Sequence, residues 1–295
     1  PPPPGTQPPP APPPPREALP AGACDTHLHV LGPYDRYPLA PERAYNVPEA
    51  PLDALRTYMA VTGLSRVVIA HVSAAGRSLD VTLDAIAALG DRARGTLALQ
   101  RDMDAGQLAQ LDDAGMRGAR LSHAFGDAIT PDGLMATADR IRPLGWHIAI
   151  WPQAAVELDA VAHIAGRLGV PIVLDHLAAN CWRPQLGPEQ AAFEALLRLL
   201  AGGHVWLKLS AMNRASTRGH PWPDLLPFAR RLIAEAPERL LWASDWPHVG
   251  IEHGPMPSPG DMLDWLAEAG ASAAARRRIL VHNAEKLFGF AEILS

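Results

Sequence analysis

Short apolar runs alternate with longer amphipathic stretches from about residue 23 to the end of the chain. Eight of the apolar runs have the length and the aliphatic content of strands that are covered on both faces of a parallel sheet. We therefore predict strands at residues 23–30, 66–71, 94–99, 118–123, 147–151, 172–176, 205–210 and 240–245.

Amphipathic patterns fill the intervals between the predicted strands. The expected helices lie near residues 79–89, 134–141, 155–168, 189–200, 224–235 and 260–268. Two helix starts are marked by Thr130-Pro131 and Ser258-Pro259. A hydroxyl side chain suits the N-cap, and proline suits the first helical position, where no backbone donor is needed.

Eight strands with a helix after each are the pattern of a single (β/α)8 TIM barrel, which spans about 250 residues. We predict that residues 21–295 form this barrel. A doubly wound open sheet is the alternative, but no strand-to-helix turn carries the glycine-rich phosphate fingerprint of that fold. Residues 1–20 hold 12 of the 31 prolines and show no apolar periodicity. We expect them to form a disordered, proline-rich N-terminal tail.

Composition narrows the class of protein further. Hydrophobic residues make up 48% of the 295 residues, which is ample for a core. The formal net charge is −5, so we expect neither a nucleic-acid partner nor a membrane partner. No apolar run approaches the ~20 residues of a membrane span. Cys24 and Cys181 are the only cysteines, which excludes a disulfide scaffold and a cysteine-rich metal site.

Ionisable and hydroxyl side chains follow five of the predicted strands. In a TIM barrel, the carboxyl ends of the strands form the active-site face. His27 and His29 are two residues apart on the first strand and so share one face. The other groups of this kind are Ser73 after strand two, Arg120 and His123 on strand four, Asp175 and His176 on strand six, and Asp245 and His248 after strand eight. Such a set predicts an enzyme active site.

The motifs H-x-H at His27–His29, D-H at Asp175–His176 and S-D-W-P-H from Ser244 to His248 resemble those of the amidohydrolase superfamily. The similarity runs from about residue 23 to 288 and is greatest to the branch of 2-pyrone-4,6-dicarboxylate lactonase. The resemblance implies a hydrolase that opens a carboxylated lactone. It also implies that the enzyme works without a metal, so we expect no cofactor.

A metal remains the alternative. Many members of the superfamily use a strand-four lysine and a strand-five histidine as ligands, and this chain has neither. His27, His29 and Asp245 are left, and three such ligands can hold one divalent ion such as zinc or manganese. A metal-dependent amidohydrolase or decarboxylase would use them in this way.

The mechanism expected for a lactonase assigns Asp245 as the base that activates water. His27, His29 and His176 would polarise the carbonyl and stabilise the oxyanion. The resemblance implies that Arg120 and Arg214 hold a substrate carboxylate, for which the planar guanidinium is suited. The further pocket candidates are Ser73, Tyr45, His248, His123 and Trp151.

The chain departs from the lactonase pattern at the second carboxylate anchor. No arginine or lysine follows Arg120 closely, and His123 is the nearest substitute. Trp151 stands where the resemblance implies a tyrosine. The substrate could therefore be a lactone with one carboxylate or a sugar-derived lactone.

Three other functions stay open from the sequence. The first is a lactone isomerase of the same branch, which resembles the chain but lacks the strand-eight aspartate that is present here as Asp245. The second is the metal-dependent enzyme, and the third is a barrel that binds a small acid without turning it over. The low cysteine content fits the cytoplasm, with the periplasm after signal removal as the alternative.

Overall fold

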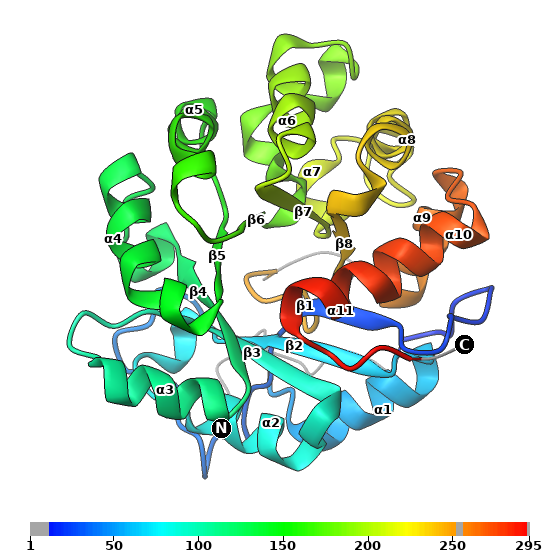
Figure 1. Cartoon of the computed structure of the whole chain (residues 1–295). Coiled ribbons are helices and arrows are strands. Elements are labelled where there is room, and N and C mark those ends of the chain that lie inside the picture. Colours follow the sequence, from blue (N-terminus) through cyan, green and yellow to red (C-terminus); the bar gives the residue numbers. More distant parts are fainter. Residues whose placement is uncertain (1–11, 252–255, 294–295) are drawn as a thin grey trace.

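The computed structural model describes residues 12–251 and 256–293. Eight parallel strands pair in sequence order around a barrel, with helices outside them (Figure 1). The strands are β1 (Cys24–Leu28), β2 (Arg66–Ala70), β3 (Ala93–Ala98), β4 (Met116–Leu121), β5 (His147–Ile150), β6 (Ile172–Leu174), β7 (Val205–Leu209) and β8 (Leu240–Trp242). All eight predicted strands and the TIM-barrel fold are confirmed.

Helices cover the outside of the strands. They are α1 (Leu52–Thr62), α2 (Asp80–Leu89), α3 (Ala105–Asp113), α4 (Pro131–Ile141), α5 (Ala155–Ile164), α6 (Ala191–Ala201), α7 (Met212–Ala215), α8 (Leu226–Glu235), α9 (Pro259–Glu268), α10 (Ala273–Arg277) and α11 (Asn283–Phe288). The side chains of Thr130 and Ser258 accept hydrogen bonds from the first turns of α4 and α9, so both predicted caps are confirmed. No helix of the described residues is long and apolar enough to span a bilayer.

Several strands end earlier than the apolar pattern predicts. β6 stops at Leu174, one residue before Asp175, and β8 stops at Trp242. His176 and Asp245 have φ values of 55° and 63°, which no strand residue adopts. The chain therefore leaves the sheet just before its ionisable residues, which places them in the loops at the carboxyl end of the barrel.

The barrel closes beyond the end of β8 rather than through a β8–β1 ladder. The N–H of Asp245 donates to the carbonyl of His27 at 2.9 Å, and the N–H of His29 donates to Trp246 at 2.8 Å. The hydroxyl of Thr26 donates to the carbonyl of Trp242 at 2.8 Å. These bonds join the histidine-bearing end of β1 directly to the segment that carries Asp245.

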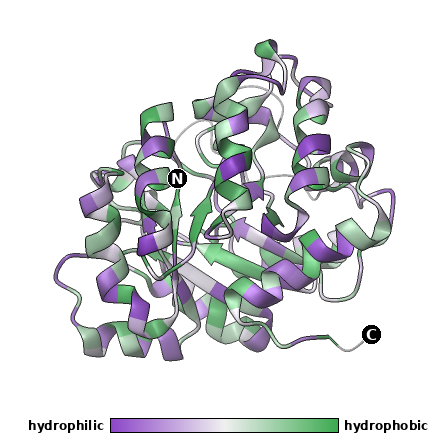
Figure 2. Ribbon diagram, turned by 45° about the horizontal axis from the view of Figure 1, so that its top comes forward, coloured by the Kyte–Doolittle hydropathy of each residue, from purple (hydrophilic) through white to green (hydrophobic). Residues whose placement is uncertain are grey.

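Two apolar layers hold the barrel. The larger lies between strands and helices, and Figure 2 shows green strands at the centre with purple positions concentrated on the helices. A smaller cluster contains Cys24, Val68 and Trp206 from the strands together with Phe288 and Phe290. Because these strand residues belong to the amino-terminal or middle part of β1, β2 and β7, α11 and the residues after it cover the end opposite the ionisable loops.

The tail differs from expectation in its described part. Residues 1–11 lie outside the described residues, so the disorder expected there stays a prediction. Residues 12–20 lie against α9 and α10. Arg16 donates to Asp264 of α9 at 2.8 Å and also pairs with Glu268, and Glu17 pairs with Arg276 of α10. The carbonyl of Pro13 approaches the Cα of Gly260 so closely that a side chain there would collide with it. Proline content alone does not reveal these charged and backbone contacts.

A buried ion pair fastens the C-terminal segment to the barrel. Arg66 on β2 contacts the Glu285 carboxylate on α11 at 2.8 Å, and both side chains are less than a tenth exposed. The Arg66 guanidinium also donates to the carbonyl of Ala291.

We expect Arg66→Met to lower the free energy of unfolding by about 3 kcal/mol, because the buried carboxylate loses its arginine. Urea denaturation measures the change. Arg56→Met is the matched control, since Arg56 pairs with Asp53 at the surface and such pairs contribute about 0–1 kcal/mol. Equal losses of unfolding free energy in the two variants would show that the Arg66–Glu285 pair contributes no more to stability than a surface pair does.

Candidate active site

The loops at the carboxyl end of the barrel enclose a cavity of about 70 Å³, enough for a few water molecules. Nine of its lining residues are among the predicted site residues. The lining consists of His27, His29, Tyr45, Val72, Ser73, Arg120, Ser122, Phe125, Trp151, His176, Arg214, Asp245 and Val249. The structure therefore brings together groups from β1, β4 and the loops after β2, β5, β6, β7 and β8.

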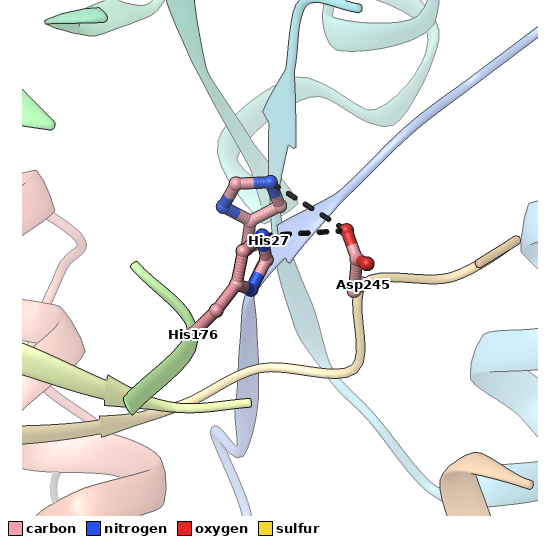
Figure 3. Close-up of side chains that lie close together, drawn as sticks. All are labelled: His27, His176 and Asp245. Carbon is pink, nitrogen blue, oxygen red and sulfur yellow. Dashed lines mark ion pairs between the residues drawn. The ribbon is translucent and has the colours of Figure 1, made fainter. Parts of the chain in front are cut away.

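Three imidazole rings surround the carboxylate of Asp245. Its Oδ1 atom lies 3.4 Å from Nε2 of His29, and 3.9 Å from Nε2 of both His27 and His176. Figure 3 shows His27 and His176 facing the carboxylate, His27 from β1 and His176 from the loop after β6. All four side chains are buried.

The pKa of Asp245 follows from these neighbours. Burial alone would raise it, but His176, His29 and Arg214 outweigh burial and hold the pKa well below its ordinary value. Burial lowers the pKa of His176 and of His27. The site therefore holds an ionised carboxylate that can accept a proton.

Hydrogen bonds fix the orientation of two of the rings. Nδ1 of His29 lies 2.7 Å from the carbonyl of Ala70, so this nitrogen carries a hydrogen and donates it. Nδ1 of His176 lies 3.0 Å from the hydroxyl of Ser210, and Trp151 packs edge-on against the same ring at 5.0 Å. In both residues Nε2 is left to face Asp245.

A lysine and an aspartate contact Nδ1 of His27. Asp175 was predicted to lie at a strand end of the active-site face, but no role was predicted for Lys208. Lys208 on β7 lies 2.9 Å from Oδ1 of Asp175 and 3.1 Å from Nδ1 of His27. Burial would raise the pKa of Asp175, but Lys208 and His27 hold it well below its ordinary value. The available signal was a lysine within an otherwise apolar strand, Val205–Leu209.

Asp25 is the second group that the sequence analysis left without a role. Its carboxylate accepts hydrogen bonds from the Tyr58 hydroxyl at 2.7 Å, from the backbone N–H groups of His27 and Ser244, and from the Ser244 hydroxyl. Burial raises the pKa of Asp25 to about 6, although the bonds from Ser244 and Tyr58 oppose the rise. The Asp25 carboxylate thus connects β1, which carries His27, to the segment that carries Asp245.

The two arginines expected to bind a carboxylate approach the cavity from different elements. Arg120 donates to the carbonyl of His71 at 2.6 Å and lies 3.8 Å from Asp175. Arg214 lies 3.5 Å from Asp245, donates to the carbonyl of Val249 and stands 5.8 Å from the ring centre of Trp151. Both guanidinium groups are only partly exposed and can meet an anion in the cavity.

The remaining predicted residues divide into two groups. Tyr45 and Ser73 line the cavity and share a 2.9 Å hydrogen bond. His248 is buried, but it does not line the cavity. His123 is also absent from the lining: it is half exposed and pairs with Glu157 at 2.6 Å. Its side chain therefore faces a carboxylate of its own protein at the surface.

Whether these residues fit a metal depends on their hydrogens as well as on their distances. Among the described residues, donor atoms of His27, His176 and Asp245 all lie within 4.8 Å of one another, which suits a divalent ion (Figure 3). His29 adds a further Nε2 atom at this point. However, Nδ1 of His27 lies 3.1 Å from the Lys208 ammonium, which can only donate a hydrogen bond. A neutral ring that accepts this bond carries its hydrogen on Nε2. A nitrogen that carries a hydrogen cannot be a ligand, so His27 does not fit a metal while Nδ1 accepts from Lys208.

A barrel with ionisable groups from several strand ends around one cavity is the arrangement of a TIM-barrel enzyme. Residues 24–290 match the amidohydrolase family, and the chain belongs to this family.

Curated relatives agree over almost the whole chain. A 4-sulfomuconolactone hydrolase from Rhizobium radiobacter is 36% identical, with 92% of this chain and 91% of the relative covered. A 2-pyrone-4,6-dicarboxylate hydrolase from Comamonas testosteroni is 34% identical, with the same shares covered. An apo crystal structure of an Agrobacterium tumefaciens protein has a TM-score of 0.82 at 27% identity and covers 95% of this chain and 100% of that one.

Buried histidines around the barrel make stability depend on pH. Burial lowers the pKa of His71 and His248 to about 4 and that of His147 to about 3. In the unfolded chain these groups return to about 6.5 and bind protons that the folded protein excludes. Stability is therefore fully present above pH ~6.5 and is lost as pH falls toward 4.

We expect the free energy of unfolding, measured by urea denaturation, to be lower at pH 5 than at pH 7. His147→Gln should reduce this difference by about 2 kcal/mol, because the variant lacks a buried imidazole that takes up a proton only in the unfolded chain. His163→Gln, at an exposed position on α5, should leave the difference unchanged. An unaltered pH dependence in His147→Gln would contradict the assignment.

Proposed function

We propose that the protein is a hydrolase that opens a carboxylated lactone without a metal, with Asp245 as the general base. The observation that carries the proposal is the ionised Asp245 carboxylate between three imidazole rings, with Arg120 and Arg214 at the same cavity. The names of the relatives supply the class of substrate.

Hydrolysis begins with a water molecule beside Asp245. The water oxygen bonds to the lactone carbonyl carbon while one water proton passes to the carboxylate. The ring C–O bond then breaks, and the proton passes from Asp245 to the departing ring oxygen. The product is the ring-opened acid, and Asp245 returns to its ionised form.

The low pKa of Asp245 makes it a weak base before substrate binds. A developing oxyanion changes this, because it competes with the carboxylate for the imidazole N–H groups and the guanidinium charge around the cavity. Asp245 then loses part of the electrostatic stabilisation of its charge, and its affinity for the water proton rises. His27 and His176 are the oxyanion donors, since each ring can carry its hydrogen on Nε2. The donor role expected for His29 is not favoured, because its ring hydrogen is on Nδ1 and bonds to the carbonyl of Ala70.

Arg120 and Arg214 would bind the substrate carboxylate. The 70 Å³ cavity holds only the reacting part of a cyclic ester, but Arg214 also lines a second cavity of about 680 Å³. The rest of the substrate can extend there. His123 is withdrawn from the cavity, so the geometry favours a substrate that needs no third cation at this point.

We further propose a cytoplasmic enzyme whose partner is this small molecule, with neither nucleic acid nor membrane involved. Both cysteines are buried and unpaired, as a reducing compartment allows. The net charge of −5 disfavours binding to polyanions.

The first experiment is hydrolysis of 2-pyrone-4,6-dicarboxylate by chelator-treated protein, followed by loss of pyrone absorbance and by identification of the product. We expect turnover without added metal and a ring-opened acid as product. Activity that returns only with zinc or manganese would overturn the metal-free mechanism. A rearranged lactone as product would show an isomerase. Failure on this substrate and on mono-carboxylated and sugar lactones would contradict the lactonase proposal.

Asp245→Asn should lower kcat by about 10²-fold or more, because an amide cannot accept the water proton. Asparagine keeps the size and tolerates the left-handed backbone at this position. Asp53→Asn, at an exposed position on α1, is the control and should leave kcat unchanged. The base assignment fails if Asp245→Asn retains more than about a tenth of the wild-type kcat.

A further inference from the structure

Lys208 is a fully buried cation that the proposed reaction does not use directly. It lies on β7 within the barrel, where only 1% of its side chain is exposed. Its Nζ atom contacts Oδ1 of Asp175 at 2.9 Å and Nδ1 of His27 at 3.1 Å. Taking an ammonium out of water is costly, so a lysine here needs partners that use its hydrogens.

The contact with His27 determines where the ring carries its hydrogen. An ammonium has three donors and no lone pair, so Nδ1 of His27 must accept. In the neutral ring the single hydrogen then lies on Nε2. Nε2 is buried at the cavity and has no hydrogen-bond partner among the described residues. It faces Asp245 at 3.9 Å, too far for a hydrogen bond but suited to a substrate atom between them.

We propose that Lys208 is a positioning residue that keeps the hydrogen of His27 on Nε2, so that His27 donates to the substrate carbonyl and does not ligate a metal. This inference rests on the proposed lactonase function for its kinetic consequence. The location of the hydrogen and the affinity for metal follow from the structure alone.

Asp175 would impose the opposite state if Lys208 were absent. Its Oδ1 atom lies 3.4 Å from Nδ1 of His27 and would then be the acceptor for a hydrogen on that nitrogen. Nε2 would present its lone pair to His176 and Asp245. A carboxylate behind a histidine in this way is the usual support of a zinc ligand. With Lys208 present, His27 is an oxyanion donor. Without Lys208, the same side chain would be a metal ligand.

The direct test uses the wild-type protein and needs no activity. In ¹⁵N NMR of histidine-labelled, metal-free protein, resonances lost in His27→Gln identify the ring. We expect a pyridine-type signal for Nδ1 and a pyrrole-type signal for Nε2. The opposite assignment overturns the proposal, whatever the enzyme's substrate proves to be. This measurement decides the question even if variants at Lys208 do not fold.

Metal binding is the second test. Lys208→Met should bind zinc about 10- to 100-fold more tightly than wild type in equilibrium dialysis, because His27 becomes a supported ligand. Lys286→Met is the matched control: it changes the only other lysine, which is exposed on α11, and should bind zinc as wild type does. Equal zinc affinity in Lys208→Met and wild type contradicts the proposal.

Kinetics separate this inference from the proposed function. In a lactone assay, Lys208→Met should lower kcat by about 10²-fold with KM little changed, as loss of one oxyanion donor does. If Lys208→Met keeps the wild-type kcat while the wild-type protein gives the expected NMR signals, His27 does not donate a hydrogen bond to the oxyanion. If wild type turns over no lactone but the NMR and zinc results hold, the proposed function fails and the role of Lys208 stands.

Discussion

The seam between β1 and β8 is the constraint on which the site depends. The barrel has no β8–β1 ladder, and closure relies on the segment after β8 and on the carboxylate of Asp25. Asp25 accepts four hydrogen bonds from three residues around it, so a buried charge is balanced by donors from β1, α1 and the segment after β8. The same bonds that close the barrel bring the histidines of β1 within reach of Asp245.

Buried charged and polar groups in the barrel interior form a connected series that leads to the cavity. Lys208 and Asp175 form a fully buried pair, His27 lies above them, and Asp245 lies beyond His27. Each group therefore contacts a partner that offsets the cost of removing it from water. Because Lys208 and Asp175 both contact Nδ1 of His27, Nε2 is the ring atom that remains free to act in the cavity.

The strand pattern could be predicted because each strand is covered on both faces and reads as an apolar run. His27, His29 and Asp245 could be predicted as well, since residues at the carboxyl end of a barrel strand lie on the active-site face. The course of the loops could not be predicted. His123 lies next to Ser122, which lines the cavity, yet its side chain turns to Glu157 at the surface. Lys208 and Asp25 were missed because a lone charge in an apolar strand acquires its role only from partners distant in the sequence.

The left-handed backbone at Asp245 limits what evolution can place there. A φ of 63° is adopted readily by glycine, asparagine and aspartate and is unfavourable for most other residues. Glutamate, the obvious exchange for another acid, would combine a strained backbone with a longer side chain in a crowded cavity. Of the residues that this backbone accepts readily, asparagine and glycine lack a carboxylate. The backbone therefore restricts the position to aspartate wherever a proton acceptor is needed.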